Sequence, residues 1–304
     1  MDGTAGTNDT NKDVIDRARY YSPANIFNVE RPTIPQMAFV AERDRAMAPN
    51  APTAWITLDI GAKIGLDEAA TTPLMLARYA RIAGGEALVG SFRASGEFYF
   101  VISGDGQATK GGETFSWTER DVFSLPGGGE TRLVGGADGA VLLQVTNEPE
   151  LAFHGLAAPF PENAPARSVR YPMADVLAEM GRVRDEQDSD PSRTGRALHL
   201  TSERNGKSDA AHPSIKLAMN TLDPLSVQRP HRHNSVALTL PIEADNVYSL
   251  VEGNRIDWHQ YALMITPPAE LHSHHNEGST PMLSLVIQDG GLYFRCRTIG
   301  FRFD

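Results

Sequence analysis

The histidines of this 304-residue chain are concentrated in its last third, where eight of the nine lie beyond residue 198. In the segment Pro230-His-Arg-His233 the two imidazoles are two residues apart, so on a strand they point to one face while the arginine between them turns away. A third candidate, His272, lies five residues after Pro267. Neutral imidazoles from neighbouring strands bind iron, copper, nickel, zinc or manganese. The pattern therefore predicts a metal site formed by His231, His233 and His272.

The remaining histidines have weaker support. His274 lies two residues after His272 and is the candidate for a catalytic or supporting role beside the ligands. The alternative interpretation is that the first two histidines lie on a solvated strand and that segment 272–275 is a polar loop. Four further histidines have no supporting pattern and are interpreted as surface or buried structural residues: His154, His199, His212 and His259.

The elements that must position these residues are short β-prone runs between glycine turns. Examples are Leu76–Ile82, Glu97–Ile102 and Ala140–Val145, and similar runs resume from Ile215 and continue through Leu292–Phe303. Such runs favour a barrel or a sandwich. Apolar residues of the second half are expected to line its barrel: Val236, Leu238, Leu240, Val247, Leu263, Ile265 and Leu283.

The two β-rich halves share the spacing between a tryptophan and a proline. Trp117 lies nine residues before Pro126, and Trp258 lies nine residues before Pro267. The same strand, turn and strand context surrounds each pair, which predicts a duplicated barrel.

A change of period separates the halves. In Tyr171–Arg184 apolar residues recur at offsets of three and four, and Pro172 suits a first helical position, so a linker helix is predicted. The expected organisation is a disordered tail at 1–20, an irregular arm at 21–72, a first barrel at 73–155, a linker with a helix at 156–205, and a second barrel at 206–304.

Composition excludes several classes of protein. The chain is 41% hydrophobic and 22% charged, which is ordinary globular usage. The net charge of −10, without a basic cluster, argues against nucleic-acid and anionic membrane partners. No apolar run approaches the ~18 residues that cross a bilayer, so a cytoplasmic location is expected. The single cysteine, Cys296, excludes an intrachain disulfide and is expected to pack in a strand.

The motif around the histidines resembles that of a known family. Pro230-His-Arg-His233, Thr266-Pro267 and His272-Ser-His-His-Asn276 are similar to the metal barrel of the bicupin ring-cleaving dioxygenases that act on gentisate, salicylate and hydroxynaphthoate. The resemblance implies an all-β bicupin, two double-stranded β-helix (jelly-roll) barrels with a short helical linker. It also implies that Fe(II) is the cofactor of His231, His233 and His272, and that the protein is a homo-oligomer.

This sequence departs from the family pattern at several positions. Cupins with a glutamate ligand place it four or five residues after the second histidine, where this chain has Ala237 and Leu238, as expected for the three-histidine branch. In the first barrel Ser91, Arg93 and Thr131 stand at the three ligand positions, while Glu97 and Gly104 keep the cupin spacing. That barrel is therefore expected to lack a metal, the reverse of the gentisate enzymes.

The substrate site also differs. The family has a carboxylate-binding arginine six residues after the second histidine, and here that position is Thr239. Arg229 and Arg255 are the candidate replacements. The resemblance and the three open positions of such a site imply a non-haem iron ring-cleaving dioxygenase that takes dioxygen and a hydroxylated aromatic acid or similar chelating substrate. Two alternatives stay open: a non-redox cupin enzyme with another divalent metal (isomerase, decarboxylase or hydrolase), and a non-catalytic ligand-binding bicupin.

Overall fold

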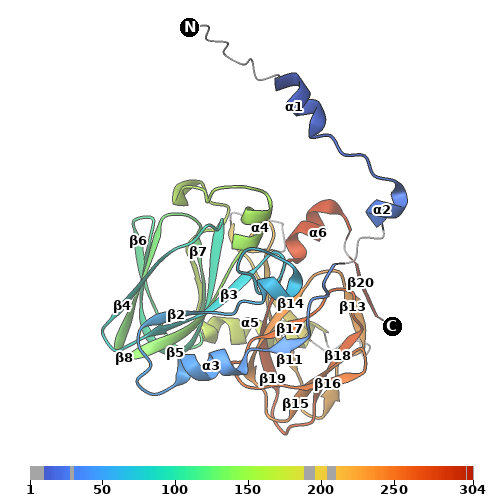
Figure 1. Ribbon diagram of the computed structural model, residues 1–304. Helices are drawn as coiled ribbons and strands as arrows, with labels where there is room; N and C mark the ends of the chain where they lie inside the picture. Colours follow the sequence, from blue (N-terminus) through green and yellow to red (C-terminus); the bar gives the residue numbers. More distant parts are fainter. Residues whose placement is uncertain (1–9, 28–30, 188–195, 204–209, 299, 304) are drawn as a thin grey trace. The chain divides into compact units, whose positions relative to one another are not determined.

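The computed structural model describes residues 10–27, 31–187, 196–203, 210–298 and 300–303 (Figure 1). The chain divides into a unit of residues 1–32 and a unit of residues 33–304. The first unit contains two short helices, α1 (Thr10–Asp16) and α2 (Pro23–Phe27). Helix α1 lies in the segment for which the sequence predicts a tail, and residues 1–9 of that segment are outside the described part of the chain.

The first barrel is an antiparallel sheet in the order β2-β3-β8-β5-β7-β9, with β4 paired to β8 and β6 paired to β5. Its strands are β2 (Ala54–Thr57), β3 (Leu76–Ile82), β4 (Ala87–Ser91), β5 (Gly96–Lys110), β6 (Glu113–Trp117), β7 (Val122–Pro126), β8 (Glu130–Thr146) and β9 (Val169–Tyr171). The long strands β5 and β8 bend at irregularities in their pairing near Gly104. Gly104 has φ +84°, and a Cβ there would lie 2.1 Å from the carbonyl oxygen of Gly139, so only glycine fits this bend.

The second barrel consists of two antiparallel sheets, in the orders β1-β17-β14-β19-β11-β10 and β16-β15-β18-β13-β20, with β12 paired to β18. The strands of the first sheet are β1 (Met37–Ala38), β10 (Arg196–Leu200), β11 (Lys216–Leu222), β14 (Ala237–Glu243), β17 (Met264–Thr266) and β19 (Met282–Gln288). Those of the second are β12 (Ser226–Val227), β13 (His231–His233), β15 (Val247–Val251), β16 (Asn254–Asp257), β18 (His272–Asn276) and β20 (Phe301–Phe303).

Residues 33–72 of the predicted arm belong to the main unit and contact both barrels. Strand β1 pairs with β17 of the second barrel, whereas β2 pairs with β3 of the first. Between and after these strands lie α3 (Val40–Met47) and the short 3₁₀ helix η1 (Gly61–Ile64). The arm is therefore more regular than its prolines suggest, because its polar backbone groups are paired along sheet edges.

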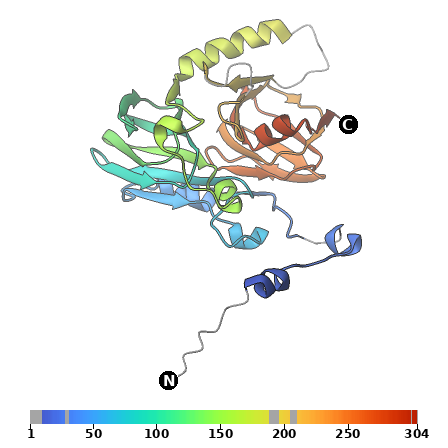
Figure 2. The same ribbon diagram turned by 90° about the horizontal axis from the view of Figure 1, so that it is seen from above.

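The linker contains the helix that the sequence predicts. After α4 (Glu148–Phe153) and the 3₁₀ turn η2 (Pro161–Asn163), helix α5 spans Met173–Gln187, directly after Pro172. Figure 2 shows α5 lying along one side of the two barrels. Its periodic residues Met173, Val176 and Met180 join the main hydrophobic core, which also contains Phe98 of the first barrel and Leu238 of the second. The two barrels therefore share one core, and the predicted fold of two barrels with a helical linker is confirmed.

The C-terminal segment corrects a sequence prediction. Instead of one strand over 292–303, helix α6 (Gly290–Cys296) precedes β20, and Cys296 is exposed rather than packed in a strand. Strand β19 ends at Gln288, and Gly291 then lies so close to Pro213 that a Cβ would be 2.3 Å from the Pro213 carbonyl oxygen. The prediction failed because a short apolar run such as Leu292–Phe294 is too short to show the periodicity that distinguishes a helix from a strand.

None of the helices in the described ranges is long and apolar enough to cross a membrane.

Candidate metal centre

Three buried histidines converge inside the second barrel. His231 and His233 project from the same face of β13, and His231 pairs directly with His272 on β18. The three side chains are 3–8% exposed, and one ring nitrogen of each lies within 4.8 Å of the others. Arg232 turns away, as predicted, and forms an ion pair of 2.7 Å with Glu252. Within the described residues, this is the group of histidine, cysteine and carboxylate side chains that could hold a metal ion.

Main-chain carbonyl groups fix the orientation of the three rings. The Nδ1 atoms of His231, His233 and His272 lie 3.1, 2.8 and 2.9 Å from the carbonyl oxygens of Arg229, Ser235 and Glu270. A carbonyl oxygen only accepts hydrogen bonds, so each Nδ1 carries the proton and each Nε2 is unprotonated and has a lone pair. Rings held in this way are ready to coordinate a metal through Nε2.

Burial keeps the three imidazoles neutral. It lowers the pKa of His272 to about 2 and that of His233 to about 4, and the charges of neighbouring histidines act in the same direction. Burial also lowers the pKa of His231. A set of three neutral nitrogen donors without a carboxylate fits a divalent transition metal and leaves the charge of that metal uncompensated. The donor chemistry thus suits the cofactor that the sequence predicts.

His274 lies beside the three histidines on the same strand. Its Nδ1 is 2.8 Å from the Ser249 hydroxyl, and the Trp258 indole N–H donates to that hydroxyl over 2.8 Å. Burial lowers the pKa of His274 to about 3, with the nearby histidines adding to the effect. The tryptophan and the serine therefore fix the ring, and its Nε2 is the atom left for a ligand in the cavity.

The metal centre opens into a cavity of about 550 Å³. His231, His233, His272 and His274 all line it, together with Thr239 and Thr266. Aromatic side chains from α6 and β20 form another part of the wall: Tyr293, Phe294, Phe301 and Phe303. The cavity can hold a small aromatic molecule next to the three histidines.

The predicted apolar wall of this cavity is wrong. On β14, Ala237 and Thr239 face the cavity, whereas Leu238 and Leu240 pack into the core shared by the two barrels. Successive residues of a strand face opposite sides, and the sequence prediction chose the apolar set. Because both faces of β14 are buried, hydrophobicity alone does not identify the inner face. Six of the predicted wall residues belong to that core and the seventh to a smaller cluster: Val236, Leu238, Leu240, Leu263, Ile265 and Leu283, and Val247.

The predicted substrate residues are not brought together. Thr239 lines the cavity and is 2% exposed. Neither Arg229 nor Arg255 is among the residues that line it. The guanidinium group of Arg229 lies 4.9 Å from the centre of the Phe303 ring, and the exposed Arg255 stacks on Tyr248.

Sequence reasoning missed the polar residues of the opposite wall. Lys216 on β11 is 5% exposed, lines the cavity and lies with its Nζ 3.5 Å from the centre of the Phe294 ring. Gln288 on β19 also lines the cavity, and its Nε2 is 3.4 Å from His233 Nε2. One signal was available, because Lys216 is a single charge inside the otherwise apolar run Ile215–Met219.

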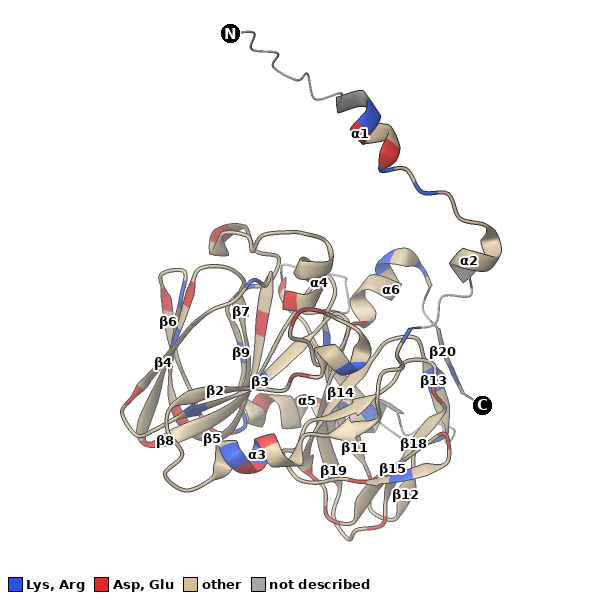
Figure 3. Ribbon diagram, viewed as in Figure 1, with Lys and Arg blue, Asp and Glu red and all other residues tan. Residues whose placement is uncertain are grey.

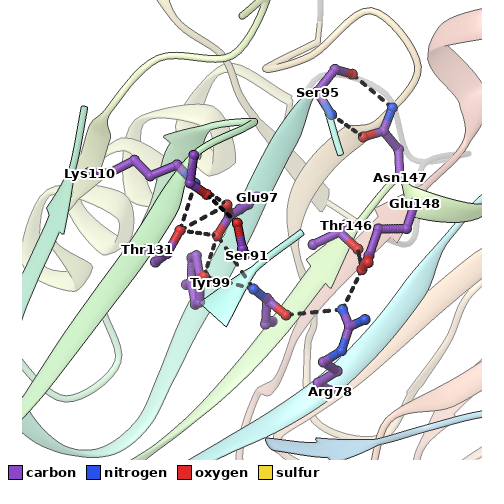
Figure 4. A network of polar contacts seen from close by, with 12 residues as sticks. Arg78, Ser91, Ser95, Glu97, Tyr99, Lys110, Thr131, Thr146, Asn147 and Glu148 are labelled. Atoms are coloured by element: carbon purple, nitrogen blue, oxygen red, sulfur yellow. Dashed lines mark hydrogen bonds and ion pairs between the residues drawn. The ribbon is translucent and has the colours of Figure 1, made fainter. Parts of the chain in front are cut away.

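The corresponding region of the first barrel holds a lysine (Figure 4). The Lys110 ammonium lies 2.7 Å from Glu97 Oε1, 2.8 Å from the Thr131 hydroxyl and 3.1 Å from the Gly129 carbonyl oxygen. Both side chains of the ion pair are fully buried. Burial raises the pKa of Glu97, and the positive charge of Lys110 opposes that rise.

Two residues assigned to the first barrel's ligand positions are not buried. Ser91 and Arg93 are exposed, and they donate hydrogen bonds to the carbonyl oxygens of Gly129 and Leu156. Thr131 is buried and contacts Glu97. The cation inside this barrel is therefore Lys110, and not Arg93 as the sequence suggests.

Comparisons with known proteins agree with this geometry. No protein-family model matches the chain. A gentisate 1,2-dioxygenase from Streptomyces sp. is 31% identical over 72 residues, which cover 24% of this chain and 20% of the relative. The match thus spans about a fifth of the length of that relative.

Solved structures extend the likeness to the whole chain. The salicylate 1,2-dioxygenase of Pseudaminobacter salicylatoxidans matches with a TM-score of 0.74 and 13% identity over 100% of this chain and 99% of that enzyme. The same enzyme in an adduct with gentisate matches with a TM-score of 0.74 and 12% identity over 97% and 93% of the two chains. The fold is therefore that of a bicupin, and the predicted resemblance to the ring-cleaving bicupin dioxygenases is confirmed.

Proposed function

We propose that the protein is an Fe(II)-dependent dioxygenase that cleaves the ring of a hydroxylated aromatic acid. The observation that carries the proposal is the set of three buried, neutral histidines with unprotonated Nε2 atoms on the wall of a cavity of about 550 Å³. The likeness to salicylate 1,2-dioxygenase supports the reaction class.

The residues of the cavity have distinct roles in this proposal. His231, His233 and His272 would hold the iron. Bound Fe(II) supplies the redox chemistry and the open coordination positions that a chelating substrate and dioxygen require. Because the three ligands are neutral, the site favours an anionic substrate that chelates through two oxygens, such as an ortho-hydroxy carboxylate. Thr239, where the family has an arginine, makes room for a substrate bulkier than gentisate.

His274 would serve as the proton-handling group. Ser249 and Trp258 fix its ring through Nδ1, which leaves Nε2 as the ring nitrogen that hydrogen-bonds a substrate hydroxyl. Burial keeps this ring neutral. The aromatic side chains of α6 and β20 would exclude water from the ring of the substrate.

Metal analysis followed by oxygen uptake tests the proposal. Protein purified without a histidine tag should contain one divalent metal per chain, and the iron-reconstituted form should consume one dioxygen per substrate with at least one salicylate, gentisate or hydroxynaphthoate. His272→Ala should lose most of the metal, because two imidazoles hold a divalent ion weakly. His154→Ala, at an exposed position in the loop after α4, is the matched control and should keep it.

Two outcomes would contradict the proposal. Full metal content in His272→Ala would exclude the assigned ligands. Tightly bound zinc or nickel as the native metal, with no oxygen uptake on any of these acids, would instead support a non-redox cupin enzyme.

The same resemblance supports assembly into a homo-oligomer. Light scattering on the purified chain tests this, and a mass of one chain at micromolar concentration would contradict it.

A further inference from the structure

The charged side chains of the cavity all have one sign. Among the described residues that line it, the full charges are Arg196 and Lys216, and no carboxylate is present. Arg196 forms an ion pair of 3.0 Å with Asp223. Lys216 is 5% exposed, so its charge lies in a poorly solvated wall where Coulomb attraction is strong.

The sheet register places Lys216 level with the metal centre. Lys216 pairs with Gln288 across β11 and β19, and Gln288 pairs with Ala237 across β19 and β14. Gln288 reaches to 3.4 Å from His233 Nε2. Lys216 is thus one strand beyond Gln288, which contacts His233.

Helix α6 fixes the lysine side chain. Its ammonium lies over the Phe294 ring, and its aliphatic part passes Gly290, where a Cβ would be 3.4 Å from Lys216 Cδ. An aromatic face attracts the ammonium group and restricts the rotamers of the side chain. The charge is therefore held in place before any ligand enters.

The surroundings of this wall are also basic, although the chain has a net charge of −10. Figure 3 shows basic residues on α6, β13 and β20, the elements beside the cavity. These include Arg295 of α6 and Arg302 of β20, whereas the charge of Arg232 on β13 is paired with Glu252. Such an arrangement attracts a small anion to this end of the barrel against the overall charge.

We propose that Lys216, supported by Phe294, is the specificity-determining residue that binds the anionic group of the substrate. Lys216 would replace the arginine that the family has at the position of Thr239. The inference rests on the proposed function, because an ortho-hydroxy carboxylate bound through two oxygens presents its remaining carboxylate oxygen to the wall. Gln288 and Lys216 then offer that oxygen an amide donor and a charged donor.

Binding of two matched probes tests the assignment. Salicylate and salicylamide chelate through the same two positions, but only salicylate carries the carboxylate. Each is titrated calorimetrically into protein loaded with Zn²⁺, which binds without turnover. Lys216→Met should weaken salicylate roughly ten- to hundredfold, the usual effect of removing a charged hydrogen bond, and change salicylamide less than about twofold. Lys216→Arg should keep most of the salicylate affinity.

The controls separate this role from packing and from the proposed function. Lys63→Met removes an exposed lysine of η1 and should change neither probe. Equal weakening of both probes in Lys216→Met, or unchanged salicylate affinity, would overturn the role of Lys216 and leave the proposed function standing. If the metal-loaded wild-type protein binds neither probe, the proposed substrate class fails, and the role of Lys216 fails with it.

Discussion

At the scale of single residues, the hydrogen-bond partners of a buried histidine decide what its ring can do. The three proposed ligand histidines donate from Nδ1 to carbonyl oxygens and keep Nε2 unprotonated. His212 has the opposite arrangement, because its Nδ1 accepts from the main-chain N–H groups of Ser214 and Ile215. Its Nε2 therefore carries the proton and donates to the Ser95 hydroxyl over 2.9 Å. This serine–histidine pair cannot activate a nucleophile, and His212 has a structural role.

The buried His212 should make stability depend on pH. Burial lowers its pKa from 6.5 to about 3, so below pH 6.5 the unfolded chain binds a proton that the folded chain does not. The stabilisation is complete above pH 6.5 and is lost towards pH 3, at about 1.4 kcal/mol per pH unit. Urea unfolding at pH 7 and pH 5 should show His212→Gln losing about 2 kcal/mol less than the wild type between these pH values. The control His154→Gln should match the wild type, and equal losses in all three proteins would contradict the prediction.

At the scale of elements, helix α6 changes the site most. The sequence predicts a strand there, but the helix brings Tyr293 and Phe294 to the cavity and places a ring under Lys216. Gly291 allows this by lying against the main chain of Pro213. The position of α6 thus depends on one close backbone contact. Adding a single methyl group at Gly291 tests this dependence.

Gly291→Ala should displace α6 from the wall. Its Cβ would lie 2.3 Å from the Pro213 carbonyl oxygen, a distance that requires the backbone to move. We expect a loss of about 1–3 kcal/mol in the free energy of unfolding, as for other overpacked sites. Weaker salicylate binding should accompany this loss. Gly181→Ala is the matched control: it lies in α5 with nothing within 4 Å of its Cβ, and should stabilise the chain by about 0.5–1 kcal/mol. An unchanged stability of Gly291→Ala would show that the contact relaxes freely.

At the scale of the whole molecule, the features that can be predicted from the sequence are those that depend on local residue spacing. The same-face pair of His231 and His233, the period of α5 and the duplicated Trp–Pro spacing are local patterns, and the structure contains each of them. The pairing of Glu97 with Lys110 is not local, although both lie on β5. Thirteen residues of straight strand would span roughly 43 Å. Only the bends near Gly104, visible in the pairing with β8, bring the two side chains together.

The first barrel contains a buried ion pair between Lys110 and Glu97, whereas the second barrel contains three neutral histidines. Lys110→Met would leave the Glu97 carboxylate buried without its ammonium partner, a change that typically costs 3–5 kcal/mol, here taken as about 4 kcal/mol. The double variant Lys110→Met/Glu97→Gln removes both charges and should recover most of that loss. The exposed control Lys63→Met should change stability by less than about 0.5 kcal/mol. Denaturant unfolding measures all three variants.

The metal content of the variants tests whether the first barrel has a structural role and the second barrel binds the metal. Each folded variant should still bind one metal per chain, because the proposed ligands His231, His233 and His272 lie in the other barrel. A second metal in Lys110→Met would show that Glu97 and Thr131 form a latent cation site and that Lys110 blocks it. Unchanged stoichiometry together with recovery in the double variant would assign the buried pair of the first barrel to folding, and metal binding to the second barrel alone.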